Sequence, residues 1–152
     1  MKIAVSSDEH THLVDVVLDE LQKRGHEVEY LGPPEGAQAS WPDVTSEAAR
    51  RVACGAADQA VVMCWTGTGA SIAANKVTGI RAALCSDAET ARGARLWNAA
   101  NVVALSLRST SEAVAREILE AWFATAPGDD DWNRRQIERL REIESQRGPS
   151  KD

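Results

Sequence analysis

One short segment of the sequence concentrates groups that could carry out chemistry, the run CWTGTGASIAANK from Cys64 to Lys76. The thiol of Cys64 is followed there by three hydroxyl side chains and two glycines. The order of the residues is Trp65, Thr66, Gly67, Thr68, Gly69, Ala70 and Ser71. Glycine lets a backbone approach a ligand closely, and the amides at a helix N-terminus favour negative charge. Because that environment stabilises a thiolate, Cys64 is a candidate base or nucleophile. The alternative is a buried cysteine that ends a strand before a tight turn.

The same segment does not match the common nucleotide-binding loops. A Walker-type loop needs a glycine directly before its lysine, and Asn75 stands there. The dinucleotide fingerprint needs a third glycine where this chain has Ile72, although Asp87 follows at about the distance of a ribose-binding carboxylate. That fingerprint also belongs to a first strand–helix turn, whereas this is the third. The turn therefore fits a cradle for an anion or oxyanion better than a dinucleotide site.

Short β-rich runs alternate with helical patterns along residues 2–126. The expected strands are residues 2–5, 27–32, 59–64, 80–85 and 101–107. This alternation predicts an α/β fold with three layers, α/β/α, around a five-stranded parallel Rossmann-like sheet. Ligands bind beyond the carboxyl ends of the strands in such sheets. Asp8 and Asp87 follow predicted strands and Cys64 ends one, so all three are expected at that edge.

Composition sets limits on the function. The chain has 152 residues, which is about one domain, and its net charge of −6 argues against general binding to a nucleic-acid backbone. The N-terminus lacks a signal-peptide pattern, and no apolar run reaches the roughly 20 residues of a membrane span. Three cysteines without CxxC spacing indicate neither a disulfide framework nor a zinc site, so a cytoplasmic protein is expected. Cys54 and Cys85 are expected in the core, and His12 and His26 at the surface.

Residues 127–152 are expected to add a helix beyond the α/β unit of residues 1–126. The segment starts at Pro127-Gly128 with acidic residues that suit a helix N-terminus. Its apolar stripe, which consists of Trp132, Ile137, Leu140 and Ile143, must pack on something. The stripe is expected to cover either this domain or a partner subunit.

The run CWTGTGASIAANKVTGIRAALCSDAETARGARLWNAANVVAL, residues 64–105, resembles the family of ribose-5-phosphate isomerase type B and galactose-6-phosphate isomerase. The SIAANK and GIRAALC pieces are specific to that family. The likeness extends from KIAVSSD near the start to RRQIERLREIE near the end, so it covers nearly the whole chain.

This resemblance implies an aldose–ketose isomerase that acts on a sugar phosphate without a metal or other cofactor. A base at the position of Cys64 would move a proton between two carbons through a cis-enediolate, while the turn from Gly67 to Ser71 would hold the oxyanion. Asp8 and Asn98 fall on substrate-contacting positions, and Thr66 on a threonine involved in ring opening. The resemblance further implies a homodimer, or a dimer of such dimers, with its site between subunits. Phosphate would be held by basic residues, for which Arg108, Arg134 and Arg135 are candidates.

The sequence departs from that family at three positions. Trp97 stands where members have the ring-opening histidine, and an indole cannot exchange protons at neutral pH. Glu9 follows Asp8 where ribose-phosphate members have a histidine, so His10 is a candidate to take over that role. Trp65 replaces the glycine next to Cys64 and adds bulk at the expected pocket. Each change could also be a packing or surface feature.

These departures lead to a hypothesis about the substrate. A sugar phosphate that is short or stays open-chain does not need the histidine replaced by Trp97. Two other functions remain open, namely epimerisation of a related sugar derivative and binding of a sugar phosphate without catalysis.

Overall fold

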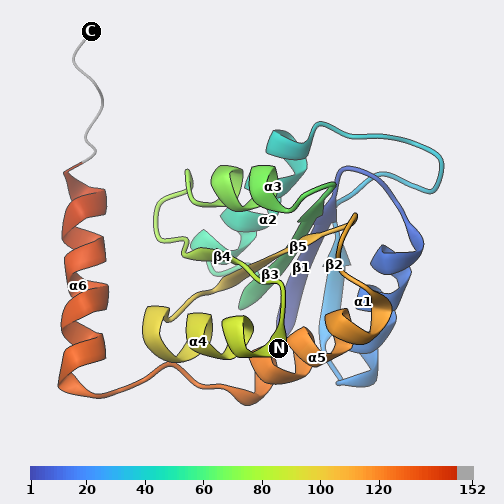
Figure 1. Cartoon of the computed structure of the whole chain (residues 1–152). Coiled ribbons are helices and arrows are strands. Elements are labelled where there is room, and N and C mark those ends of the chain that lie inside the picture. The colour runs from blue at the N-terminus through green and yellow to red at the C-terminus, as the bar shows by residue number, and fades with distance from the viewer. Residues whose placement is uncertain (147–152) are drawn as a thin grey trace, which may run out of the picture.

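The structure is a computed structural model that describes residues 1–146, so the last six residues of the predicted tail 127–152 lie outside the described part. Strands and helices alternate along the chain, as the sequence predicts (Figure 1). The strands are β1 (Lys2–Ser7), β2 (Glu27–Tyr30), β3 (Gln59–Cys64), β4 (Ala82–Leu84) and β5 (Val102–Ser106). The helices are α1 (His12–Lys23), α2 (Trp41–Ala53), α3 (Thr68–Ala74), α4 (Ala88–Asn98), α5 (Glu112–Ala124) and α6 (Asp131–Ser145).

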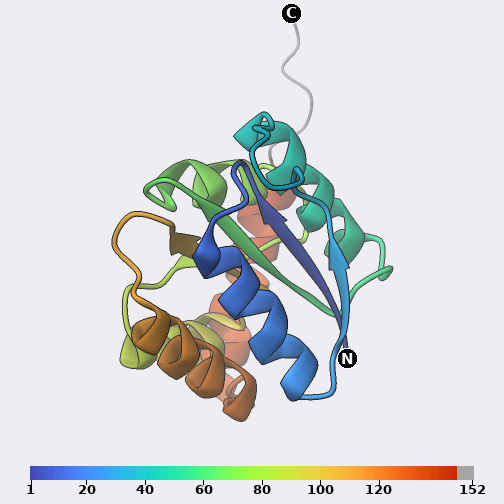
Figure 2. The ribbon, with the colours of Figure 1, turned by 90° about the vertical axis from the view of Figure 1, so that its right-hand side faces the viewer.

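The five strands form one parallel sheet in the order β2-β1-β3-β5-β4, with helices on both faces. Helices α2 and α3 cover one face, while α1, α4 and α5 cover the other (Figures 1 and 2). The predicted α/β/α fold is therefore confirmed. The chain adds strands on one side of β1 and then on the other, so a crevice opens where β1 and β3 end, the place where such sheets bind ligands.

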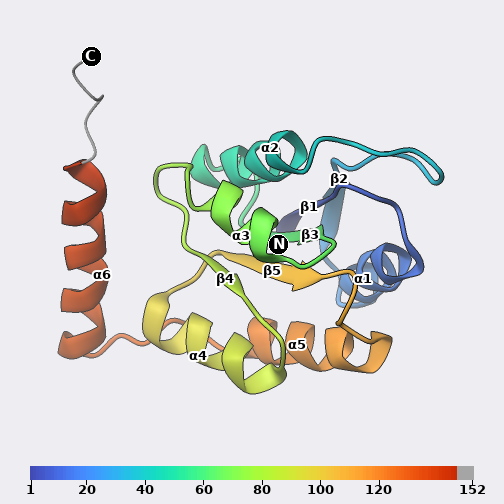
Figure 3. The same ribbon diagram turned by 45° about the horizontal axis from the view of Figure 1, so that its top comes forward.

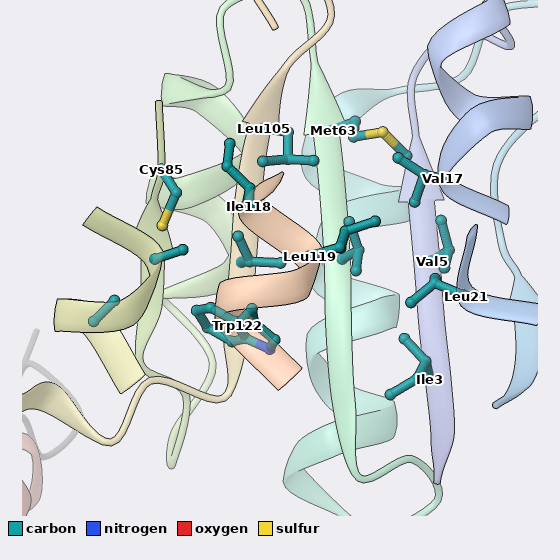
Figure 4. Packing of buried hydrophobic residues seen from close by; sticks show 14 of the residues in the cluster. Ile3, Val5, Val17, Leu21, Met63, Cys85, Leu105, Ile118, Leu119 and Trp122 are labelled. Carbon is teal, nitrogen blue, oxygen red and sulfur yellow. The ribbon is translucent and has the colours of Figure 1, made fainter. Parts of the chain in front are cut away.

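The alternation of side chains along the strands builds two different cores. Ile3, Val5 and Met63 point toward α1, α4 and α5, where they pack with Trp122 and other large side chains (Figure 4). The opposite face carries small residues, and Cys64 belongs to it because it follows Met63 in β3. Small side chains let α2 and α3 lie close to the sheet, so the sulfur is held near the start of α3.

Several local predictions need correction. Cys54 is not in the core: it ends α2, is exposed, and its thiol donates to the carbonyl of Arg51. Cys85 is buried as predicted, and burial raises the pKa of its thiol to about 12. His12 is exposed, whereas His26 is half-buried because its ring packs on Phe123.

Helix α6 stands beside the β4 edge of the sheet, where it contacts α4 (Figures 1 and 3). It is joined to the body where Gly128 donates its amide to the carbonyl of Leu96, and where Glu144 accepts from the amide of Gly79. Trp132, Leu140 and Ile143 of the predicted stripe remain exposed. Within residues 1–146, no helix has the length and apolar character needed to cross a membrane.

Candidate active site

A cavity of about 280 Å³ lies at the carboxyl ends of β1 and β3. Ser7 pairs with Met63 in the sheet register, so Asp8 and Cys64 leave neighbouring strands at the same level. The cavity is lined by Asp8, Trp41, Cys64, Trp65, Thr66, Thr68 and Gly69. The structure thus brings together five of the residues selected from the Cys64–Lys76 segment and the aspartate that follows β1.

The sulfur of Cys64 is buried in the wall of this cavity, with 5% of the residue exposed. The amide of Ala70, in α3, donates to Cys64 Sγ at 3.4 Å. A donor directed at the sulfur stabilises negative charge there, as the start of a helix does. The amides of Thr68 and Gly69 occupy the first two positions of α3, which have no partner within a helix. They remain available for an oxyanion.

Gly67 makes the turn between β3 and α3 possible. Its φ is +73°, in the left-handed region that glycine occupies without strain. A Cβ at this position would stand 2.9 Å from the carbonyl carbon of Leu105 and 2.6 Å from a methyl group of Leu84. Both the conformation and the space therefore require glycine, and they set where Thr66 and Thr68 lie. The hydroxyls of these two threonines are 2.6 Å apart.

Asp8 supplies the carboxylate of the cavity. Its Oδ1 is buried and has no hydrogen-bond partner among the described residues. Burial, the largest effect, raises the pKa of this carboxyl above its ordinary value. Ionisation of Asp8 therefore lowers the free energy of unfolding. The loss begins as the pH rises above the pKa of a free aspartate, and it reaches its full size above the raised pKa of Asp8. An acceptor kept unpaired at this cost is suited to a ligand hydroxyl.

Two indoles form the apolar part of the cavity wall. Trp65 is 59% exposed, so it lies at the rim rather than covering the core. Trp41, the first residue of α2, was not selected by the sequence analysis. The sequence does carry a signal for it. Trp41 directly precedes Pro42, proline is common in the first turn of a helix, and helices of a parallel sheet begin near the edge where strands end.

Glu9 and His10 lie beside the cavity and are not among its lining residues. Glu9 pairs with Gln38, whose amide donates to the Glu9 carboxylate at 2.8 Å. His10 Nε2 is 2.7 Å from a carboxylate oxygen of Asp15, and its ring packs edge-on against Tyr30. Local partners thus direct both side chains to the neighbouring loop and helix.

Ser71 and Asp87 serve local structure. The Ser71 hydroxyl donates to the carbonyl of Ala82 at 3.5 Å, toward β4 rather than the cavity. Asp87 is the N-cap of α4, and its carboxylate accepts from the amide and hydroxyl of Thr90. These bonds hold the pKa of Asp87 below its ordinary value. Capping of α4 therefore explains an aspartate at this position without a bound ribose.

Trp97 and Asn98 lie at the end of α4, in a hollow of about 680 Å³ shared with α6 and separate from the Cys64 cavity. The Trp97 ring lies over Gly93, where a Cβ would be 2.7 Å from the ring. This explains a glycine inside α4, because it makes room for the indole. Asn98 also borders a second hollow of about 360 Å³ along α6.

The three predicted phosphate-binding arginines occupy different places. Arg108 is exposed and follows β5, and its amide donates to the carbonyl of Trp65, so it lies nearest the cavity. Arg134 forms ion pairs with Asp129 and Asp131, whose hydrogen bonds raise the pKa of its guanidinium. Arg135 is exposed on α6. Within residues 1–146, no group of three or more His, Cys, Asp or Glu side chains is arranged to hold a metal.

Comparison with known proteins places this geometry in a family. The family model described as ribose/galactose isomerase matches residues 3–143. The chain is 38% identical to the D-erythrulose-4-phosphate isomerase of Pectobacterium atrosepticum over 125 residues, which are 81% of this chain and 82% of the relative. It is 34% identical to ribose-5-phosphate isomerase B of Escherichia coli, over 86% of this chain and 87% of that protein.

A solved structure, ribose-5-phosphate isomerase B of Clostridium thermocellum, superposes with a TM-score of 0.92 at 36% identity. The superposition covers 97% of this chain and all of that one. Since the family model, the relatives and the solved structure each match more than three quarters of the chain, the chain belongs to the ribose/galactose isomerase family of sugar-phosphate isomerases.

Proposed function

We propose that this protein is an aldose–ketose isomerase that uses Cys64 as its base on a short or open-chain sugar phosphate. The observation that carries the proposal is the Cys64 sulfur itself, which lines a cavity at the switch point of the sheet while a backbone amide donates to it. Proton abstraction beside a carbonyl needs a positioned base and a way to stabilise the resulting oxyanion. The cavity offers both.

The reaction is a proton transfer between two neighbouring carbons. The Cys64 thiolate removes the proton from the carbon beside the carbonyl, which gives a cis-enediolate and a thiol. The thiol then returns a proton to the former carbonyl carbon, while the proton of the neighbouring hydroxyl passes to the former carbonyl oxygen, so that aldose and ketose interconvert with no net gain or loss of atoms. The free amides of Thr68 and Gly69 and the threonine hydroxyls stabilise the enediolate oxygens. Asp8 accepts a hydrogen bond from a substrate hydroxyl.

The substrate preference rests on Trp97. An indole cannot move protons in ring opening, so a substrate that is already open-chain suits this protein best. A tetrose phosphate cannot close its ring through the hydroxyl that carries the phosphate. A relative covering most of the chain is named a D-erythrulose-4-phosphate isomerase, which supports this choice.

Solvent-deuterium exchange followed by NMR tests the activity and the preference together. In heavy water, the wild type should place deuterium on the carbon beside the carbonyl of D-erythrulose 4-phosphate. Its kcat/KM for that compound should exceed that for ribose 5-phosphate by about tenfold or more, a typical discrimination for one carbon. Comparable turnover of the two compounds would refute the preference for short substrates.

The same experiment separates the alternatives. A protein that only binds sugar phosphates shows no exchange with any of them. An epimerase exchanges deuterium, but its product is a stereoisomer with the carbonyl on the original carbon, which NMR distinguishes from an aldose. The Cys64 geometry favours exchange, and nothing in the cavity is specific to inversion.

We also propose that the active form is a homodimer in the cytoplasm. The exposed apolar side chains of α6, namely Trp132, Leu140 and Ile143, need an apolar partner surface. In a dimer, Trp97 and Asn98 could also face the Cys64 cavity of the partner subunit, which would explain why they lie outside the Cys64 cavity of their own chain. Sedimentation velocity should give the mass of two chains, and a monomer at micromolar concentration would contradict the proposal. A reducing compartment keeps the Cys64 thiol free, which fractionation of cells with redox-state labelling of Cys64 can check.

A further inference from the structure

We infer that Trp41 is a specificity-determining residue, whose indole selects against sugar phosphates that carry additional hydroxylated carbons. This inference rests on the proposed function and adds a second basis for the preference for short substrates, the cavity wall formed by Trp41, to the loss of ring opening at Trp97. Trp41 lines the Cys64 cavity from α2, a helix that contributes no other lining residue.

The chain that leads into Trp41 is attached to the strand end that carries the site carboxylate. The amide of Ala39 donates to the carbonyl of Asp8 at 2.9 Å, and the Gln38 side chain donates to Glu9 at 2.8 Å. These bonds lie two and three residues before Trp41. The indole therefore stands on a helix start whose position relative to Asp8 is fixed, which gives Glu9 a positioning role outside the cavity.

The ring also lies directly against the turn that cradles the substrate. A Cβ at Gly69 would be 3.2–3.3 Å from three atoms of the Trp41 ring, which is closer than side chains normally pack. A side chain at position 69 would therefore press on the indole and require it to shift by a few tenths of an ångström. The ring thus closes the cavity on the side of Gly69, while 42% of the residue remains exposed.

The cavity has few partners for the hydroxyls of a long sugar chain. Apart from the base Cys64, its polar side chains are Asp8 and two threonines, and the threonine hydroxyls, 2.6 Å apart, are occupied by each other and by the enediolate oxygens. The remaining large side chains, Trp41 and Trp65, add the largely apolar surface of two indole rings to the cavity wall. A hydroxyl placed against such a face gives up its hydrogen bond to water and gains none in return, which is costly. A short substrate avoids this loss because all of its hydroxyls can reach the polar side.

The test compares the kcat/KM of two substrates, ribose 5-phosphate and D-erythrulose 4-phosphate, as a ratio. Trp41→Ala should raise the ratio of the former to the latter roughly 10- to 200-fold, the range for changes of one carbon in an apolar pocket. Trp41→Phe keeps an apolar ring at the helix start and should raise it less. A ratio within about twofold of the wild type in folded Trp41→Ala would overturn the inference. If Trp41→Ala does not fold, an unchanged ratio in Trp41→Phe overturns it.

A second pair of variants tests the contact itself. Gly69→Ala should change the substrate ratio in the wild-type background and change it less when combined with Trp41→Ala, because the ring it displaces is gone. Equal effects in both backgrounds would show that the two residues act independently and would contradict the assigned wall. If the wild type exchanges deuterium with neither sugar phosphate, the proposed function itself is wrong, whatever the Trp41 variants do.

Discussion

Replacing Cys64 with serine should lower kcat by about a thousandfold and leave KM within about threefold of the wild type, as expected for loss of a general base. Serine fits the same space and retains a hydrogen-bonding group beside the amide of Ala70, but its hydroxyl is a far weaker acid than a thiol. It therefore supplies almost no anionic base at neutral pH. Deuterium exchange into the substrate measures the lost step directly.

Cys54→Ser is the matched control for this substitution. Cys54 is exposed at the end of α2 and lies outside the cavity lining, so its replacement should leave kcat and KM unchanged. Cys64→Ala should bind substrate yet show no exchange, because the base is absent while the cavity remains. More than about a tenth of wild-type kcat in Cys64→Ser would show that another group is the base.

Replacing Gly67 with alanine should lower both stability and activity. The left-handed φ costs about 1–2 kcal/mol for a residue with a Cβ, and the overlap with the Leu105 backbone and Leu84 adds about 1–3 kcal/mol of overpacking. Together these predict a fall of roughly 4–20 °C in the thermal midpoint. Movement of the turn should also reduce kcat/KM by about 100-fold, since it carries the groups that face the substrate.

Gly25→Ala separates the two parts of that cost. Gly25 has a φ of +78°, close to that of Gly67, but a Cβ there would meet no atom within 4 Å. Its replacement should therefore show the conformational cost alone and leave activity unchanged. Thermal unfolding of the two variants side by side gives the contribution of the overlap. Equal midpoints would mean that β5 and Leu84 yield to the added methyl group.

The α/β/α fold could be predicted from the sequence alone, from the way strand and helix patterns alternate along it. Alternating strand and helix patterns admit few arrangements, because parallel strands need helical crossovers of one hand. The same rule places residues that follow strands at one edge of the sheet, which is why Asp8 and Cys64 could be expected together. Side chains alternate between the two faces of the sheet along β3. Cys64 therefore lies on the face of the small residues, opposite Met63.

Tertiary structure decided what surrounds that sulfur. Trp41 is distant from Cys64 in sequence, and no local pattern shows that its ring rests on Gly69. Glu9 and His10 adjoin Asp8 in sequence, yet their side chains pair with Gln38 and Asp15 outside the cavity lining. The reason is physical: strand order fixes where a backbone runs, whereas the direction of an exposed side chain depends on the nearest partner that the rest of the chain brings to it.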